Sequence, residues 1–267
     1  MKMRCWKGIL YLLILLTPGC NDVFEFSPNQ TFDGDSPVGI NARNIEQLHN
    51  RPVDDTITIA FIGDSQRFYD EAIRFVDKVN TLGSVDFVLL AGDITDFGLL
   101  EEFEQINGIF SKLDAPYVGV IGNHDVQARG EETFERTFGA LNFSFVYDSI
   151  KFIVHNTNGR EYPAGQVPDL QWLADQFTDD PAVKNFVAVS HVPPFDRDFD
   201  KTLEPAYTQL LHDKNTLISL HGHIHRFKDG YPYNDGMRYM TSHSFDKRAF
   251  VLMKISNGIV TYSIIDY

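Results

Sequence analysis

Three chemically active side chains stand next to one another at Asn123, His124 and Asp125, directly after the short apolar run Val118–Ile121. An amide, an imidazole and a carboxylate in consecutive positions have no evident packing role. Together they can provide a metal ligand, a proton donor and a group that orients the donor. The tetrapeptide Gly122–Asp125 therefore predicts a catalytic site, provided that further ligands meet it in the fold.

Polar side chains with the chemistry of metal ligands also follow four other apolar runs that we expect to be strands. The carboxyl ends of parallel strands meet at one edge of a sheet, where sites in α/β proteins form. Carboxylate, amide and imidazole without a thiolate suit Mn²⁺, Fe, Zn²⁺ or Mg²⁺. The set is too large for one ion, and it suits two ions about 3.5–4 Å apart that share a bridging carboxylate. The residues are Asp64, Gln66, Asp93, Asn123, His191, His223 and His225.

From Thr56 onwards, strand-like and helix-like patterns alternate along the chain. Strands are expected at Ile57–Ile62, Val85–Ala91, Tyr117–Ile121, Phe143–Tyr147, Lys151–His155, Asn185–Ser190, Thr216–Leu220, Met237–Ser242, Arg248–Ile255 and Ile259–Asp266. Helices are expected at Phe68–Val79, Leu99–Leu113, Glu131–Phe138, Leu170–Phe177 and Leu203–His212. The βαβ units at the front imply parallel pairing and the later hairpins imply antiparallel pairing, so we expect a mixed-sheet α/β sandwich.

Five short motifs carry a family resemblance. They are GDSQ (63–66), GDITD (92–96), GNHD (122–125), SHVPP (190–194) and GHIH (222–225). In this order they resemble the calcineurin-like metallophosphoesterase superfamily, over the chain from about Thr56 to the end. The resemblance implies a four-layer α/β sandwich over residues 53–267, with two mixed β-sheets flanked by helices. It also implies metal-dependent hydrolysis of a phosphomonoester, phosphodiester or pyrophosphate bond.

The resemblance also implies a role for each site residue. The first ion is held by Asp64, Gln66 and His225, the second by Asn123, His191 and His223, and Asp93 bridges the two. A metal-bridging hydroxide attacks phosphorus, while His124 protonates the leaving group. Asp125 is expected to orient the ring of His124.

Gln66 departs from the family pattern, which usually has a histidine at this position. An amide oxygen is a harder and weaker donor than imidazole, so we expect a weakened first site. Among Mn, Fe, Zn and Mg, the pair of divalent ions is expected to be Mn or Fe, with zinc disfavoured. The glutamine also tilts the expected substrate slightly towards a diester or pyrophosphate bond.

The N-terminus has the features of an export signal. A basic start, Met1–Lys7, precedes the apolar run Ile9–Leu16 and then Cys20, which resembles a bacterial lipoprotein signal over residues 1–20. Cleavage would leave Cys20 as a lipidated N-terminus, on an exported lipoprotein anchored to a membrane of a bacterial cell envelope. An ordinary signal peptide or an uncleaved anchor is the alternative. Residues 21–52 are expected to be a tether, with a short helix at Ala42–Asn50.

The composition excludes some partners. The chain has 23 Lys and Arg against 37 Asp and Glu, a net charge of −14, which repels nucleic-acid and lipid phosphates. A phosphorylated small molecule therefore needs a local positive centre, such as metal ions. Two alternatives remain, a non-catalytic lipid-anchored binding protein with this fold and a protein serine/threonine phosphatase. The sequence does not indicate the substrate or the oligomeric state.

Several other polar residues have two interpretations. Asp96 is expected to cap a helix or to support the site, with a role as a metal ligand as the alternative. His155, His212, His221 and His243 are expected to be structural. The loop residues near the motifs either line a substrate pocket or belong to the plain surface. They are Arg67, Arg129, Phe195, Arg197, Tyr231 and Tyr233.

Overall fold

The computed structural model describes residues 31–52, 55–178 and 180–267. The expected signal segment with Cys20 and the first ten residues of the expected tether lie outside the described residues. Within the described ranges, no helix is both long and apolar enough to cross a bilayer.

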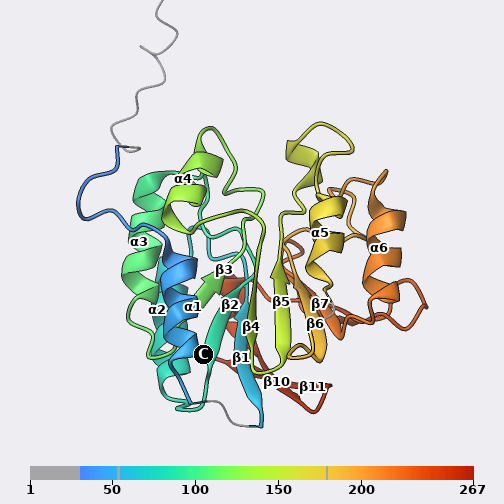
Figure 1. Cartoon of the computed structure of the whole chain (residues 1–267). Coiled ribbons are helices and arrows are strands. Elements are labelled where there is room, and N and C mark those ends of the chain that lie inside the picture. The colour runs from blue at the N-terminus through green and yellow to red at the C-terminus, as the bar shows by residue number, and fades with distance from the viewer. Residues whose placement is uncertain (1–30, 53–54, 179) are drawn as a thin grey trace, which may run out of the picture.

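Among these residues, the strands form two mixed β-sheets (Figure 1). The first has the order β11-β10-β1-β2-β3, in which β1, β2 and β3 are parallel and β10 and β11 are antiparallel to their neighbours. Its strands are β1 (Ile57–Ile62), β2 (Phe87–Leu90), β3 (Tyr117–Gly119), β10 (Ala249–Ser256) and β11 (Ile259–Asp266).

The second sheet has the order β4-β5-β6-β7-β9-β8, with β5, β6, β7 and β9 parallel and antiparallel strands at both edges. Its strands are β4 (Phe143–Tyr147), β5 (Ile150–Val154), β6 (Asn185–Val189), β7 (Ile218–His221), β8 (Lys228–Gly230) and β9 (Tyr239–Thr241). The short strand β8 has a charged, exposed sequence, which is why apolar patterning did not predict it.

The two sheets bury one core between them. Along β1, Ile57, Ile59 and Phe61 face the second sheet, whereas Ala60 and Ile62 face the helices, as the two-residue period of a strand requires. Phe87 of β2 meets Phe152 of β5 across the core, with ring centroids 5.3 Å apart in an edge-on arrangement. This sequence pattern makes β1 a buried central strand.

Helices cover the outer faces of both sheets (Figure 1). Helices α2 (Tyr69–Asn80), α3 (Leu100–Phe110) and α4 (Gly130–Thr137) pack on the first sheet, and α5 (Leu170–Gln176) and α6 (Glu204–Asp213) pack on the second. Single 3₁₀ turns lie at Gly159–Glu161 and Phe245–Lys247. The arrangement confirms the expected four layers, with each mixed sheet between the core and its helices.

Helix α1 (Ile40–His49) corrects the expected extent of the tether. Its residues Ile40 and Leu48 are buried, and the side chain of Asn41 pairs with the edge strand β3. The Asn41 amide donates to the carbonyl of Gly119 and accepts from its N–H, both at 2.9 Å. The helix thus satisfies an open sheet edge, and the folded body begins before residue 40 rather than at 53.

Candidate metal centre

The motif loops are tied to one another through backbone hydrogen bonds. The N–H of Asp64 donates to Gly92, that of Gln66 to Asp93, and that of Gly222 to His191, at 2.9, 3.0 and 3.1 Å. Gly63 also forms a bridge with Ser244, which joins the two sheets immediately before Asp64. The strand ends therefore form one connected layer that holds the polar side chains on a shared edge.

Five of the seven expected ligands have left-handed backbone conformations. Their φ angles are 58° at Asp64, 35° at Gln66, 50° at Asp93, 68° at His223 and 56° at His225. Residues with a Cβ pay free energy for this conformation, of order 1–3 kcal/mol each, and such strain clusters at functional sites. Apolar patterning gives no signal for it, so the sequence predicted the residues but not their conformations.

One glycine permits the closest approach between two of these loops. A Cβ atom at Gly122 would overlap the backbone nitrogen of Asp93 and its carboxylate. Glycine is therefore required between β3 and the asparagine that follows it. The N–H of His124 then donates to Asp93 Oδ1 at 2.9 Å.

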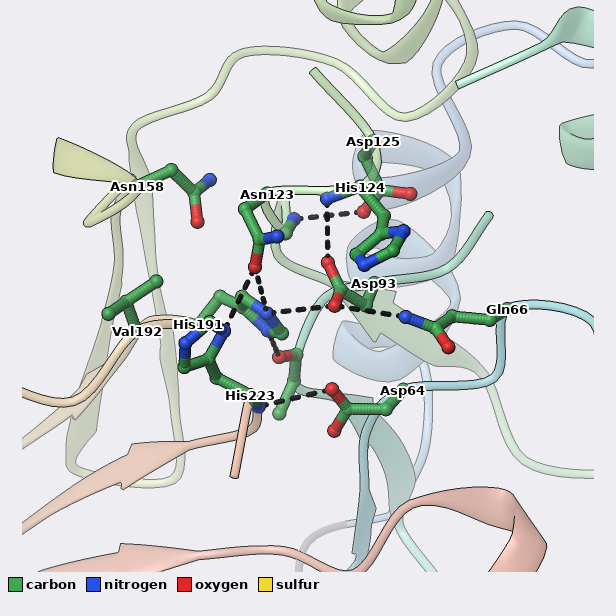
Figure 2. A network of polar contacts seen from close by, with 12 residues as sticks. Asp64, Gln66, Asp93, Asn123, His124, Asp125, Asn158, His191, Val192 and His223 are labelled. Atoms are coloured by element: carbon green, nitrogen blue, oxygen red, sulfur yellow. Dashed lines mark hydrogen bonds and ion pairs between the residues drawn. The ribbon is translucent and has the colours of Figure 1, made fainter. Parts of the chain in front are cut away.

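Two groups of potential ligand atoms share Asp93. Figure 2 shows Asp93 together with Asp64, His191 and His223. The first group contains Asp64, Asp93 and His225, and the second contains Asp93, His191 and His223, with the donor atoms of each group within 4.8 Å of one another. In the second group, His191 Nε2 lies 3.2 Å from Asp93 Oδ2. In the first, His225 Nε2 lies 3.2 Å from Asp64 Oδ1.

Asn123 joins the second group through its side-chain oxygen. Asn123 Oδ1 lies 3.1 Å from His191 Nε2 and 2.9 Å from His223 Nδ1 (Figure 2). The structure thus brings together all the residues that the sequence nominated as ligands. Their coordination of metal stays a prediction.

The residues present fit a pair of cations. Asp64 and Asp93 are both buried, and Asp64 Oδ2 has no hydrogen-bond partner among the described residues. A buried carboxylate oxygen without a partner costs about 1–3 kcal/mol or more, because charge is poorly solvated there. A bound ion would satisfy it, and the oxygen and imidazole donors are those of Mn, Fe, Zn or Mg sites.

The pKa values of the buried pair Asp93 and His191 also indicate that this site needs positive charge. Burial alone would raise the pKa of Asp93, but the positive charge of His191 lowers this pKa to about 2. Burial alone would lower the pKa of His191, but Asp93 and then Asp64 raise it to about 9. The imidazolium proton supplies the positive charge that these carboxylates need, which is the charge a metal ion would supply instead.

The side-chain amide of Gln66 contacts Asp93, the carboxylate that both groups share. Gln66 Nε2 donates to Asp93 Oδ2 at 3.2 Å (Figure 2). Rotation of this amide by half a turn would present its oxygen on the same side, and oxygen is the atom that an ion coordinates. The side chain is therefore placed for the ligand role that its position in the motif implies.

His124 is held by Asp96 and not by its neighbour in the chain. His124 Nδ1 donates to the backbone carbonyl of Asp96 at 2.9 Å and lies 3.7 Å from its carboxylate. This contact fixes the ring and leaves Nε2 as the nitrogen that can act on a substrate. The imidazole is 32% exposed, in keeping with a group that meets a ligand.

Asp125 has a different role from the one expected. Its carboxylate is fully buried and accepts from the N–H groups of Gly122, Ile94 and Thr95 at 2.8, 3.1 and 2.8 Å. It also accepts from the Thr95 hydroxyl at 2.7 Å. The prediction that Asp125 orients the ring of His124 is wrong, because this carboxylate binds the backbone of two motif loops.

Sequence reasoning also missed two acidic residues beside His223. Asp196 Oδ1 and Asp198 Oδ2 lie 3.5 and 3.3 Å from His223 Nε2. They follow the SHVPP motif, and the alternating aspartates at 196, 198 and 200 were a signal that could have indicated them. Arg160 and Arg197 lie 2.8 and 3.7 Å from Asp198 Oδ1, so this side of the site carries both signs of charge.

A buried, motif-bearing edge between two mixed sheets defines a phosphoesterase type of site. The chain belongs to the calcineurin-like phosphoesterase family, whose model matches residues 57–227.

Two curated proteins are similar to this chain in sequence. Serine/threonine-protein phosphatase CPPED1 of Homo sapiens is 27% identical over an alignment of 192 residues that covers 61% of this chain and 60% of that protein. Probable glycerophosphodiester phosphodiesterase GpdQ of Arcobacter nitrofigilis is 25% identical over an alignment of 119 residues that covers 40% of this chain and 42% of that protein. The match thus covers less than two thirds of the length of either relative.

A solved structure supports the fold. Purple acid phosphatase PPD1 from yellow lupin (Lupinus luteus) seeds superposes with a TM-score of 0.59 at 11% sequence identity. The match covers 80% of this chain and 52% of that one. At this identity the likeness shows a shared fold.

Proposed function

We propose that this protein hydrolyses a phosphoester bond of a small phosphorylated molecule with the help of two divalent ions. The observation that carries the proposal is Asp93, which belongs to both groups of potential ligand atoms. Asp64, Gln66 and His225 would hold one ion with Asp93, and Asn123, His191 and His223 would hold the other. When bound, the ions would lower the pKa of water towards neutrality and offset the negative charge of the phosphate oxygens.

The chain itself supplies the proton for the leaving group. Asp96 keeps Nδ1 of His124 engaged, so an imidazolium at this position presents its Nε2 proton outwards. General-acid assistance of this kind typically accelerates a reaction about 10²–10⁴-fold. The backbone contacts of Asp125 keep the loop that carries His124 in register with Asp93.

Gln66 supports a preference for manganese or iron. Its amide replaces an imidazole in the first group, which weakens that group for zinc more than for harder ions. A second candidate function, a protein serine/threonine phosphatase, rests on the similarity to CPPED1. Phosphopeptide substrates test it directly.

The decisive experiment is a matrix of metals against substrates. Protein stripped with a chelator is reloaded with Mn²⁺, Fe²⁺, Zn²⁺ or Mg²⁺ and assayed on p-nitrophenyl phosphate, bis-p-nitrophenyl phosphate and a phosphopeptide. We expect turnover that requires metal and is fastest with Mn²⁺ or Fe²⁺ on a small substrate. Folded protein that turns over nothing with any metal would identify a binding protein with this fold.

Comparing alanine variants of two histidines separates the catalytic role of His124 from the general effect of losing an imidazole. His124→Ala should lower turnover about 10²–10⁴-fold with both ions still bound. His212→Ala changes an exposed histidine at the end of α6 and should leave turnover unaltered. Full activity in His124→Ala would remove this residue from the mechanism.

We also propose that the protein is an exported lipoprotein, attached to a membrane of the cell envelope through lipidated Cys20. The support is the order of basic residues, apolar run and Cys20 at the start of the chain. A tether between Cys20 and the folded body would leave the candidate site free to meet soluble substrates.

A further inference from the structure

The two ring nitrogens of His223 face different surroundings. His223 Nδ1 lies 2.9 Å from Asn123 Oδ1, on the side of the second group of potential ligand atoms (Figure 2). His223 Nε2 lies 3.3 Å from Asp198 Oδ2 and 3.5 Å from Asp196 Oδ1, on the side of the loop that follows the SHVPP motif. One nitrogen is therefore available to an ion, whereas the other faces two carboxylates.

Only one nitrogen of a neutral imidazole can bind an ion, because the ring has one lone pair and one N–H. Asp196, Asp198 and His223 also form a group of potential ligand atoms, but these aspartates are 26% and 19% exposed and have other partners. The second group offers the ring the buried side chains of Asp93 and His191. It is therefore the better ion site, and Nε2 of His223 keeps the ring proton.

The two carboxylate oxygens of Asp198 have separate partners. Oδ1 accepts from Arg160 Nη1 at 2.8 Å and lies 3.7 Å from Arg197 Nε. The backbone N–H of Arg160 also donates to the carbonyl of Asp198, at 3.2 Å. Among the described residues, the ring of His223 is the one hydrogen-bonding or charged partner that lies against Oδ2. Contacts on the outer side thus hold the carboxylate while Oδ2 faces the ring.

Asp196 has a different task in the same loop. Its Oδ1 accepts from the backbone N–H of Asp198 at 3.0 Å, a contact that closes a turn at this point. This oxygen also lies farther from His223 Nε2 than Asp198 Oδ2 does. Asp196 therefore shapes the turn that carries Asp198, and Asp198 has the oxygen that is free for the ring.

The neighbouring candidate ligand His191 shows the same division between its two nitrogens. His191 Nδ1 contacts the backbone carbonyl of Ala91 at 2.6 Å, while Nε2 faces Asp93. A histidine that binds a metal usually donates its other N–H to a carbonyl or carboxylate, which fixes the tautomer and the ring orientation and makes the binding nitrogen more basic. For His223, the acceptor in this position is the carboxylate of Asp198.

We propose that Asp198 is a positioning residue for the second ion: its Oδ2 accepts a hydrogen bond from the Nε2–H of His223 and thereby presents Nδ1 to the ion. The inference rests on the proposed two-ion site and deepens it, because it assigns a residue outside the ligand set to the affinity of that site. Arg160 holds the carboxylate from its outer side.

The binding of Mn²⁺ to chelator-stripped protein is the first test, with free Mn²⁺ measured by electron paramagnetic resonance. We expect Asp198→Ala to weaken the more tightly bound Mn²⁺ about 10- to 100-fold, the usual effect of losing such an acceptor. Asp198→Asn should fall between the alanine variant and the wild type, because its amide oxygen can still accept from Nε2–H. Circular dichroism checks the fold, and the asparagine variant serves alone if the alanine variant does not fold.

Arg160→Ala is the matched control, because it breaks the same surface ion pair from the other end. It leaves the carboxylate of Asp198 beside the ring, and an exposed ion pair contributes little by itself. We therefore expect Mn²⁺ affinity close to that of the wild type. A loss as large as that in Asp198→Ala would assign the effect to the surface ion pair and overturn the inference.

The tautomer of His223 is a second readout, which a merely structural role of Asp198 would not move. Metal-free protein with ¹⁵N-labelled histidine is examined by NMR at about pH 8, where histidine is ordinarily neutral. The His223 signals are identified by their absence in His223→Ala. We expect the proton on Nε2 in the wild type and on Nδ1 in Asp198→Ala, where Asn123 Oδ1 can accept it.

The outcomes separate this inference from the proposed function. Equal Mn²⁺ affinity in Asp198→Ala and the wild type, or the same His223 tautomer in both, would overturn the role of Asp198 and leave the two-ion site standing. A folded wild type that binds no Mn²⁺ would instead remove the two-ion site, and the inference with it.

Discussion

Removal of a single hydroxyl group, in Tyr207→Phe, should destabilise the fold beneath the candidate metal centre. Tyr207 lies on α6 and is completely buried. Its hydroxyl contacts His155 Nε2 at 2.9 Å and also bonds with Ser190 and Ser219. The hydroxyls of these two serines lie 3.0 and 2.9 Å from the ring nitrogens of His221. A buried polar network thus connects α6 to the strands that carry His191 and His223.

The magnitude follows from what the variant leaves behind. Phenylalanine keeps the packing of the ring but leaves His155 Nε2 without its partner in a site that water does not reach. A buried polar atom that loses its partner costs about 1–3 kcal/mol. We therefore expect the free energy of unfolding to fall by that amount, with a drop of several degrees in Tm.

Tyr239→Phe provides a matched control within the same layer. Tyr239 is buried on β9 and its ring stacks on His221 with centroids 6.1 Å apart. Its hydroxyl has no hydrogen-bond partner among the described residues. Removing it relieves an unsatisfied group, so the free energy of unfolding should stay constant or rise.

Urea unfolding of metal-free protein, followed by circular dichroism, measures both variants. The midpoint should fall in Tyr207→Phe and not in Tyr239→Phe, with the same m-value in each, since the surface exposed on unfolding is unchanged. Equal midpoints for the two variants would refute the reasoning, because it attributes the difference to one satisfied hydroxyl and one unsatisfied hydroxyl.

Three further predictions concern the site and its anchor. Asp125→Asn should lower the free energy of unfolding by about 2–4 kcal/mol, because the amide nitrogen of asparagine cannot accept from the backbone donors. A variant with unchanged stability in urea but lost turnover would contradict this. Gln66→His should raise the zinc content of protein dialysed against equimolar Mn²⁺ and Zn²⁺, measured by elemental analysis, and an unchanged zinc content would count against Gln66 as a ligand. Cys20→Ser should abolish incorporation of radiolabelled palmitate in expressing bacteria, whereas retained labelling would place the lipid elsewhere.

The fold was predictable because the spacing of apolar residues along the chain clearly marks its strands and helices. The stretches at 59–62 and 186–189 are apolar throughout, and such stretches become central strands buried on both faces. Helix α1 was placed in the tether because few of its residues are apolar, and one of its three buried residues is Asn41, whose amide pairs with the edge of β3. A polar residue that completes a sheet edge has no apolar signature.

The five motifs predicted which polar residues the structure brings together, whereas the contacts between these residues could not be predicted. Parallel pairing of β1 with β2 brings Asp64 and Asp93 to one edge of the first sheet. His191 follows β6 of the second sheet, so it meets them only because the two sheets pack together. The left-handed conformations at five candidate ligands and the direction of each side chain depend on hydrogen bonds between loops, which sequence spacing does not encode.

Asp96 and Asp125 show why adjacency in a motif is a poor guide to partnership. Asp125 follows His124 directly, but in a turn successive side chains diverge, and only a buried carboxylate has enough acceptor sites for the three backbone donors around it. Asp96 comes from another loop and supplies a backbone carbonyl to His124. No substitution removes a backbone carbonyl, so the His124 ring should keep its orientation in Asp96→Asn. A change in turnover of that variant would then report only the loss of the carboxylate charge that pairs with Arg67.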